Sequence, residues 1–200
     1  MAEEIAQHIA LMGSLAGEEL SVMEKVATRI ADTLNAGRKL IALGNGGSAA
    51  DAEHFVAELV GRFRADRKPL AAIALTSNTS SITAIANDYG FENVFGRQLE
   101  GLASPGDTVF AISTSGNSLN VLRALESARR LGLTSIGLTG RRGHRMRDIV
   151  DYCLCVPSDS TARIQEAHIL IIHILTAAIE SALVSTRQLV SADHTATNRG

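Results

Sequence analysis

The chain contains few of the residues on which nucleic-acid binding depends. It has no Trp, only 4% aromatic residues, two Cys and three Pro among 200 residues. With so few rings there is little surface on which bases can stack. The 19 Lys and Arg residues stand against 21 Asp and Glu, which gives a net charge of −2 and no basic surface for a polyanion. We therefore expect no nucleic-acid partner.

The two cysteines, Cys153 and Cys155, are too few for a disulfide framework. They are separated by a single residue in a predicted strand, where they are not expected to bridge each other. No further cysteine is present to complete a thiolate metal site. We therefore expect both thiols to be inert.

Signals for export and membrane insertion are also missing. Residues 1–13 are acidic and lack the cationic segment of a signal peptide. The longest apolar stretch, 169–179, is interrupted by His173 and Thr176 and falls short of a membrane span. We expect a cytoplasmic protein with no membrane partner.

The sequence does contain a regular alternation of short apolar runs and helical segments. A chain of 200 residues with 46% apolar residues favours one globular domain. The apolar runs predicted to be strands are residues 39–43, 70–75, 107–112, 133–138 and 151–156. Because helical segments separate them, the pattern predicts an α/β three-layer sandwich. In this fold class, helices flank a mostly parallel five-stranded sheet of the Rossmann-like or flavodoxin-like kind.

Helical segments lie at both ends of this domain, for which we predict the bounds 1–190. In the N-terminal segment, 1–36, apolar residues recur at helical spacing, as one long helix or two shorter ones. The segment 162–187 is predicted as a long helix that is apolar almost all round, so the core and another subunit are expected to bury it. The polar tail, 191–200, is predicted to be disordered.

Two polar loops follow predicted strands and precede predicted helices, where backbone N–H groups and the helix dipole favour an anion. The first is 44–48 (GNGGS), and the second is 113–118 (STSGNS). Each alone could be an ordinary turn, but two such loops predict a small phosphorylated ligand. A nicotinamide cofactor is not expected, because the end of the second strand, 75–78, carries no acidic residue for the ribose.

His54 and Glu58 are neighbours on one helix face, four positions apart. The pair could be half of a metal site, an acid–base pair, or simply an exposed helix pair. The last helix carries Gln165 and His173, of which His173 could equally be a core histidine. These two are eight positions apart, about 12 Å of helix rise and roughly 80° of rotation. One metal would therefore bind both only if the helix were distorted or if different subunits supplied them.

Four segments in order resemble the sugar-isomerase (SIS) domain family, and within it the phosphoheptose isomerases. They are GNGGSAADAEHFVAEL at 44–59, AIANDYGF at 84–91, AISTSGNS at 111–118 and RIQEAHILIIH at 163–173. The resemblance implies a homotetramer, with sites at subunit interfaces, that converts sedoheptulose 7-phosphate to D-glycero-D-manno-heptose 7-phosphate. That reaction is the first step of bacterial heptose biosynthesis, which supplies lipopolysaccharide precursors.

Residue roles follow from the resemblance at the matching positions. They are phosphate binding by Ser113, Thr114, Ser115 and Ser118, sugar binding by Asn45, Gly46, Gly47, Asn87 and Asp88, and one zinc ion per subunit held by His54, Glu58, Gln165 and His173. Asn87 and Asp88 could equally form a helix cap or a turn. On chemical grounds we expect Glu58 to act as the base at carbon and His173 to move a proton at oxygen. Glu58 and Gln165 are also expected to contact the substrate.

One position departs from the family pattern. Where members often carry an Asp three or four residues before the Gln, this chain has Ala162 and Thr161, and the nearest acid is Asp159. An alternative function is that of a non-catalytic SIS protein that binds a phosphosugar or associates with a replication initiator, because the segment 162–165 is similar to that branch. The branch lacks the Glu and the last His of the acid–base pair, both of which are present here. An isomerase for a different phosphosugar is the third alternative.

Overall fold

The centre of the fold is a sheet of five parallel strands. The protein is described from a computed structural model, which covers residues 1–17, 19–141 and 143–196 without the side chains of 144 and 184–196. The strands are β1 (Leu40–Gly44), β2 (Ala72–Ala74), β3 (Thr108–Ser113), β4 (Thr134–Gly140) and β5 (Tyr152–Val156). Their order is β2-β1-β3-β4-β5, and each neighbouring pair is parallel. The predicted α/β class with a five-stranded sheet is confirmed.

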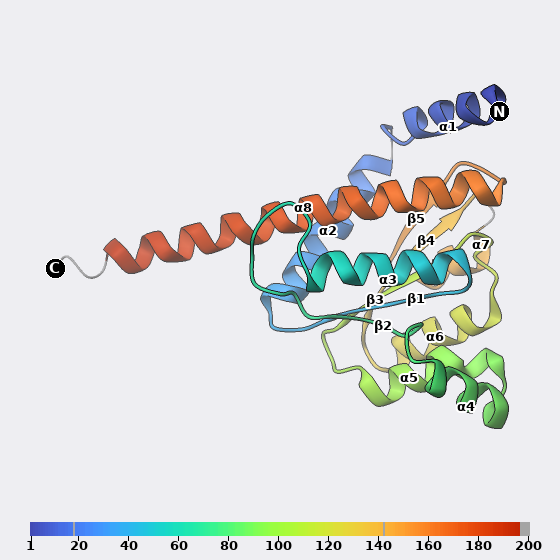
Figure 1. The fold of residues 1–200 in the computed structure, drawn as a ribbon. Coiled ribbons are helices and arrows are strands. Elements are labelled where there is room, and N and C mark those ends of the chain that lie inside the picture. Colours follow the sequence, from blue (N-terminus) through green and yellow to red (C-terminus); the bar gives the residue numbers. More distant parts are fainter. Residues whose placement is uncertain (18, 142, 197–200) are drawn as a thin grey trace.

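Helices cover both faces of this sheet (Figure 1). They are α1 (Ala2–Ser14), α2 (Glu19–Asn35), α3 (Gly47–Val60), α4 (Thr79–Tyr89), the short 3-10 helix η1 (Phe91–Asn93), α5 (Val94–Leu102), α6 (Leu119–Arg130), α7 (His144–Arg147) and α8 (Thr161–Ala196). Helices α2, α3 and α8 pack on one face, and α4, α5 and α6 pack on the other. The N-terminal segment is two helices rather than one, and α1 contacts α8.

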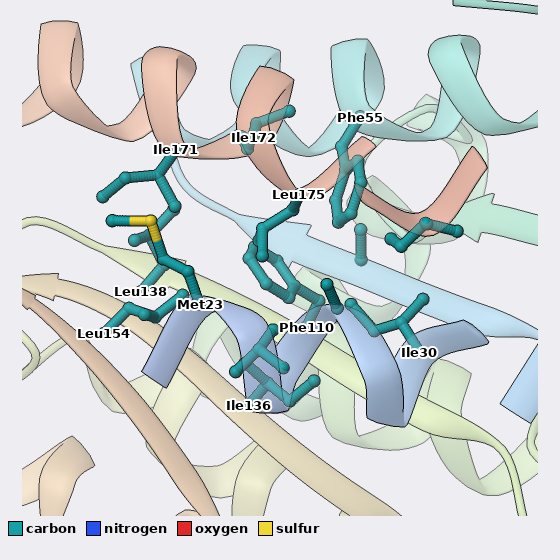
Figure 2. Close-up of a cluster of buried hydrophobic side chains, with 14 of the residues drawn as sticks. Met23, Ile30, Phe55, Phe110, Ile136, Leu138, Leu154, Ile171, Ile172 and Leu175 are labelled. Atoms are coloured by element: carbon teal, nitrogen blue, oxygen red, sulfur yellow. The ribbon is translucent and has the colours of Figure 1, made fainter. Parts of the chain in front are cut away.

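Strand side chains alternate between two hydrophobic clusters, one on each face of the sheet. In β1, Leu40 belongs to the cluster under α2, α3 and α8, whereas Ile41 belongs to the cluster under α5 and α6. Figure 2 shows the first cluster, in which Phe55 of α3 meets Phe110 of β3 edge to face with ring centroids 5.0 Å apart. Because both faces are covered, the strands are nearly continuous apolar runs in the sequence.

Helix α8 is longer than predicted and belongs to the core. It continues to Ala196, so residues 191–196 of the predicted disordered tail are helical, and 197–200 lie outside the described residues. By length and composition its stretch Thr161–Leu183 is apolar enough to cross a membrane, contrary to the expectation that it falls short. Half of that stretch is buried in the molecule, where it packs on α2, α3 and the sheet (Figure 2). Its apolar character is therefore that of a core helix.

Candidate active site

Helix α3 carries two of the predicted site residues on the side that points away from the core. Its Ala52, Phe55 and Leu59 are buried. His54 and Glu58 lie on another side of the helix, with side chains that are 42% and 20% exposed. Both side chains are therefore partly open to solvent, on a helix that packs against α8.

His54, Glu58 and His173 converge on one point between α3 and α8. His54 Nε2 lies 3.0 Å from His173 Nε2 and 3.3 Å from a carboxylate oxygen of Glu58. The three potential ligand atoms all lie within 4.8 Å of one another. Residues 119 positions apart in the chain are thereby brought into contact. We call His54, Glu58 and His173 the donor cluster.

The donor cluster fits a zinc ion. Zinc binds imidazole nitrogen and carboxylate oxygen at about 2.0–2.2 Å, so two donors at tetrahedral positions stand roughly 3.4 Å apart. The separations of 3.0 and 3.3 Å around His54 Nε2 are close to that value. Two His and one Glu also leave a fourth position for water or substrate, as in catalytic zinc sites.

Gln165, predicted as a fourth ligand, does not join the donor cluster within one chain. Its side-chain amide lies against Gly47 at the start of α3, where a β-carbon would collide with the amide nitrogen. His173 follows eight residues later, about 12 Å along the same helix. Because α8 is a continuous α-helix through both positions, a helix distortion does not bring them together. Only different subunits could therefore supply Gln165 and His173 to one metal.

Packing holds the His173 ring in place. Phe63, in the loop after α3, stacks on it with ring centroids 5.5 Å apart and ring planes 20° apart. A hollow of about 600 Å³ beside it is lined by Phe63, Arg64, Leu170, His173, Ile174, Ala177 and Ala178. The core histidine of this helix is instead His168, which is fully buried and whose pKa burial lowers to about 4.

A buried ion pair between Arg67 and Glu180 ties the end of α3 to α8. The Glu180 carboxylate accepts hydrogen bonds from the backbone N–H groups of residues 63–65 at 3.0 to 3.1 Å, and from Arg67 Nε at 2.8 Å. The guanidinium of Arg67 also donates to the backbone carbonyl of Glu58 at 2.7 Å. Both charged side chains are at most 5% exposed. This Arg67–Glu180 clamp fixes the turn that carries Glu58 relative to the helix that carries His173.

Sequence reasoning missed three residues that shape the site. For Arg67 and Glu180 the available signal was an acidic residue inside an apolar helix, because a buried charge needs a partner. Asn120 exchanges two side-chain hydrogen bonds with Asn45, at 2.9 and 2.8 Å. This pair joins the start of α6 to the glycine-rich loop. The signal for Asn120 was its place just after the second polar loop.

The loop after β3 forms a surface of hydroxyl groups, and we call residues 113–118 the hydroxyl loop. Ser113 Oγ and Ser118 Oγ are 3.3 Å apart, and Ser115 Oγ accepts the backbone N–H of Asn117 at 3.2 Å. A hollow of about 300 Å³ beside the loop is lined by Thr114, Ser115, Asn117, Ser158, Asp159, Thr161 and Ile164. Hydroxyl and backbone N–H groups donate to phosphate oxygens, so the chemistry of the loop suits a phosphate monoester.

The hydroxyl loop and the donor cluster lie at different heights along α3. Gly44 pairs with Ile112 at the ends of β1 and β3, so the hydroxyl loop lies at the edge of the sheet where α3 begins. His54 and Glu58 follow Gly47 by seven and eleven residues, about 10 and 16 Å along the helix. The two features are therefore separate regions of one chain.

The predicted sugar-binding residues are also divided. The Asn45 amide is engaged by Asn120 near the hydroxyl loop. Asn87 and Asp88 are exposed near the end of α4, on the opposite face of the sheet from α3, and Asn87 Nδ2 donates to Asp88 Oδ1 at 2.8 Å. One chain by itself does not gather all the predicted site residues into one pocket.

Asp51 adds a titratable group near the donor cluster. It lies one turn before His54 on α3, and one of its carboxylate oxygens is buried with no hydrogen-bond partner among the described residues. Burial raises the pKa of Asp51 to about 6, although the nearby His54 acts to lower it. The site therefore includes a carboxyl group that keeps its proton to a higher pH than an ordinary Asp.

Gly116 holds the hydroxyl loop in a backbone conformation that other residues adopt only with strain. Its φ is 61°, and a β-carbon there would collide with the Gly143 backbone and lie 3.0 Å from Thr139 Oγ1. We expect Gly116→Ala to lower the free energy of unfolding by more than the roughly 1–2 kcal/mol of left-handed strain alone. It should also weaken binding of inorganic phosphate. Urea unfolding and phosphate titration measure the two effects.

Gly132→Ala is the matched control for that substitution. Gly132 has a φ of 68° but nothing within 4 Å of the position that a β-carbon would take. We expect Gly132→Ala to lower the free energy of unfolding only by the roughly 1–2 kcal/mol of left-handed strain. Its affinity for phosphate should not change. Equal losses of stability in the two variants, or wild-type phosphate affinity in Gly116→Ala, would contradict the role given to Gly116.

The chain is similar over most of its length to proteins that share one domain. SIS domain families match residues 5–140 and residues 95–192. A phosphoheptose isomerase of Geotalea daltonii is 54% identical over 186 residues, which cover 92% of this chain and 96% of the relative. One of Trichlorobacter lovleyi is 51% identical over 183 residues, which cover 92% and 93%. The solved structure of a phosphoheptose isomerase from Neisseria gonorrhoeae has a TM-score of 0.86 at 42% identity and covers 90% of this chain and 96% of that one.

Proposed function

The chain belongs to the SIS domain family, and on that premise we propose that it is a sugar-phosphate isomerase that converts sedoheptulose 7-phosphate to D-glycero-D-manno-heptose 7-phosphate in bacterial heptose biosynthesis. The observation that carries the proposal is the donor cluster, in which a carboxylate and two imidazoles offer atoms within 4.8 Å of one another. Aldose–ketose isomerisation needs such a set, because one proton leaves carbon while another moves between two oxygens.

Glu58 is the base and His173 the proton shuttle in this mechanism. Starting from the ketose, Glu58 removes a proton from C1, and the electrons of that C–H bond form the C1–C2 double bond of an enediol. His173 gives a proton to the oxygen at C2 and later accepts one from the hydroxyl at C1, which becomes the new carbonyl. Glu58 then returns its proton to C2, so that protons and charge balance over the cycle.

A zinc ion in the donor cluster is the cofactor that we propose, held by His54, Glu58 and His173. When bound, the ion polarises the carbonyl and hydroxyl oxygens of the substrate. A carboxylate that binds zinc tightly is a weaker base, and an imidazole nitrogen that binds zinc carries no proton. Glu58 and His173 can therefore fill both roles only through the carboxylate oxygen and the ring nitrogen that the metal leaves free. The Phe63 stack and the Arg67–Glu180 clamp orient His173 and Glu58 relative to each other.

A second subunit completes the site in this proposal. The hydroxyl loop and the donor cluster are about 10 Å or more apart along α3, and Gln165 lies at the hydroxyl-loop end. The mostly apolar hollow beside His173 offers a surface for another copy of the chain. We propose a cytoplasmic homotetramer with its sites at subunit interfaces, in which Gln165 acts on a neighbour's donor cluster. Sedimentation equilibrium of the purified protein tests the assembly.

The substrate contacts follow the same division of the site. The phosphate would be held by Ser113, Thr114, Ser115 and Ser118, and the sugar hydroxyls would be contacted by Asn45, Gly46, Gly47, Asn87, Asp88 and Gln165. Phosphate binding far from the reacting carbons supplies positioning energy for the proton transfers.

Incubation with sedoheptulose 7-phosphate, followed by NMR, tests the proposed reaction. We expect the aldose phosphate to form, and in D2O we expect deuterium at C2 of the product when the proton held by Glu58 exchanges with solvent. Turnover of a different ketose phosphate alone would keep the mechanism and overturn the substrate. No turnover at any zinc concentration, together with tight binding of a replication initiator, would establish the non-catalytic alternative.

Removal of a ligand side chain tests the metal assignment. We expect His54→Ala to lower the zinc content from about one ion per chain to well below one, because the chain then offers only two of its three donors to the ion. Atomic emission of dialysed protein measures it. His8→Ala is the control, since His8 lies outside the donor cluster and pairs with Glu166 at 2.8 Å. Unchanged zinc content in His54→Ala would remove the donor cluster as the metal site.

A further inference from the structure

The two cysteines lie together at the edge of the sheet, away from the candidate active site. Strand β5 is the last strand of the sheet and carries Cys153 and Cys155, both unpaired and half-buried. Their Sγ atoms are 3.5 Å apart. Leu154 and Val156 of the same strand belong to the cluster under α8, so the two thiols point to the opposite face of the sheet. The sheet therefore separates them from the donor cluster.

The sulfur separation is too long for a disulfide but suits chelation. A disulfide needs an S–S distance of about 2.05 Å and β-carbons about 3.5–4.5 Å apart, whereas alternate residues of a strand stand about 6.6 Å apart at Cα. The pairing of Cys153 with Gly137 and of Cys155 with Thr139 holds β5 extended. By contrast, two sulfurs bound at about 2.3 Å to a tetrahedral centre stand about 3.8 Å apart. The 3.5 Å separation in this strand is close to that value.

The surroundings of the two thiols favour a reactive pair. A hydrogen bond from Cys153 stabilises the thiolate of Cys155, and the charge of Arg147 adds to the effect, so the pKa of Cys155 falls to about 7 although burial and Glu19 oppose it. The same hydrogen bond and burial raise the pKa of Cys153. Near neutral pH one sulfur is thus a nucleophile beside a thiol that still carries its proton. A reactive pair is the alternative to the expectation that both cysteines are inert.

We propose that Cys153 and Cys155 form a dithiol site that chelates a thiophilic metal or metalloid centre through two protein sulfurs. Among the described residues no third Asp, Glu, His or Cys ligand completes a cluster with them. The site therefore suits a centre that needs only two sulfurs from the protein. A trivalent organoarsenic centre meets that requirement, and a soft divalent cation such as Cd²⁺ meets it with water in its other positions.

The reaction with an aryl arsenoxide balances without an oxidant or reductant. Both S–H bonds break, two As–S bonds form, and the oxygen of the arsenoxide leaves with the two protons as one water molecule. Arsenic stays trivalent throughout. A single thiol can make only one of the two bonds, so a stable product requires both cysteines on the same chain.

Intact-mass measurement of the reduced full-length protein treated with phenylarsine oxide tests the site. We expect one adduct per chain, with the mass of the reagent less one water, that resists a monothiol and is reversed by a dithiol. Cys153→Ser and Cys155→Ser are matched controls, because each keeps one thiol, whose accessibility is checked with iodoacetamide. No stable adduct on the wild type, or a stable adduct on either single variant, would overturn the proposal.

Cadmium binding gives a second readout that does not depend on the arsenical. We expect ultraviolet sulfur-to-cadmium charge-transfer absorbance when Cd²⁺ is added to the reduced protein, and the same absorbance in His54→Ala, in which the donor cluster is disabled. Both single cysteine variants should lose most of it. No such absorbance in the wild type, or full absorbance in Cys155→Ser, would contradict a dithiol site.

Discussion

Glu58→Gln is expected to lower kcat for the sugar phosphate by about 10²- to 10⁴-fold, the range in which a positioned acid or base contributes. An amide cannot accept the proton from carbon, although it has nearly the same size and hydrogen-bonding reach as the carboxylate. KM should change little, because the proposed phosphate contacts are made by the hydroxyl loop, which is remote from Glu58 along α3. Initial rates at several substrate concentrations, followed by NMR, measure both constants.

Two controls separate the roles of Glu58. Glu53→Gln alters an exposed residue on the same helix and should keep the wild-type kcat. Because Glu58 is also a proposed zinc ligand, both variants are assayed at saturating zinc with their zinc content measured. A rate that stays low with zinc bound identifies the base. Full activity of Glu58→Gln at saturating zinc would show that Glu58 does not remove the proton.

Glu180→Ala is expected to lower the free energy of unfolding by about 3–5 kcal/mol, the cost of breaking a buried ion pair by removing one partner. The change leaves the guanidinium of Arg67, which is 5% exposed, without its carboxylate. It also removes the acceptor for three backbone N–H groups of residues 63–65. Urea unfolding followed by circular dichroism measures the loss. Glu180→Gln keeps an acceptor oxygen, so its free energy of unfolding should fall by less. It replaces Glu180→Ala in the measurement if the alanine variant does not fold.

Glu100→Ala is the matched control for burial. Glu100 pairs with Arg130 at 3.0 Å, close to the 2.8 Å of the Arg67–Glu180 pair. The side chains of Glu100 and Arg130 are, however, 49% and 62% exposed. An exposed pair contributes at most about 1 kcal/mol, because water and salt screen it. If Glu100→Ala and Glu180→Ala lower the free energy of unfolding by the same amount, burial of the Arg67–Glu180 clamp is not what stabilises the fold.

The pH dependence of stability distinguishes the charge of Glu180 from its packing. Burial raises the pKa of Glu180, but the backbone N–H groups of residues 63–65 and Arg67 outweigh it, so the pKa lies below its ordinary value of 4.5. The unfolded chain then takes up the proton at higher pH than the folded chain. The stabilisation is therefore fully present above about pH 5 and is lost as the pH falls through the folded pKa. The stability difference between wild type and Glu180→Gln should shrink on acidification, and a constant difference would contradict this account.

The fold was predictable because its signals are local. The apolar run 39–43 predicted a buried strand, and the observed strand is Leu40–Gly44. Its alternate residues enter two separate cores, which is why the run contains no polar alternation. The length of α8 was not predicted, because the polar composition of 191–200 indicates neither a core nor a helix cap, yet the helix continues to Ala196.

The candidate site was only half predictable. The spacing of His54 and Glu58 follows from the helical repeat, so their proximity needed no structure. The pairing of His54 with His173 joins residues 119 positions apart and depends on how α8 lies against α3. The same packing leaves Gln165 at the start of α3, outside the donor cluster of its own chain.

By itself the sequence determined which residues share a strand face or a helix side, because backbone geometry repeats every 2 or 3.6 residues. It also determined where polar loops follow buried strands. The family resemblance placed His173 with His54, but only the tertiary structure decided that Gln165 lies outside their cluster within one chain and that Glu180 meets Arg67. The reason is that the height and rotation at which two helices pack depend on side-chain volumes across the whole core, and no local spacing encodes them.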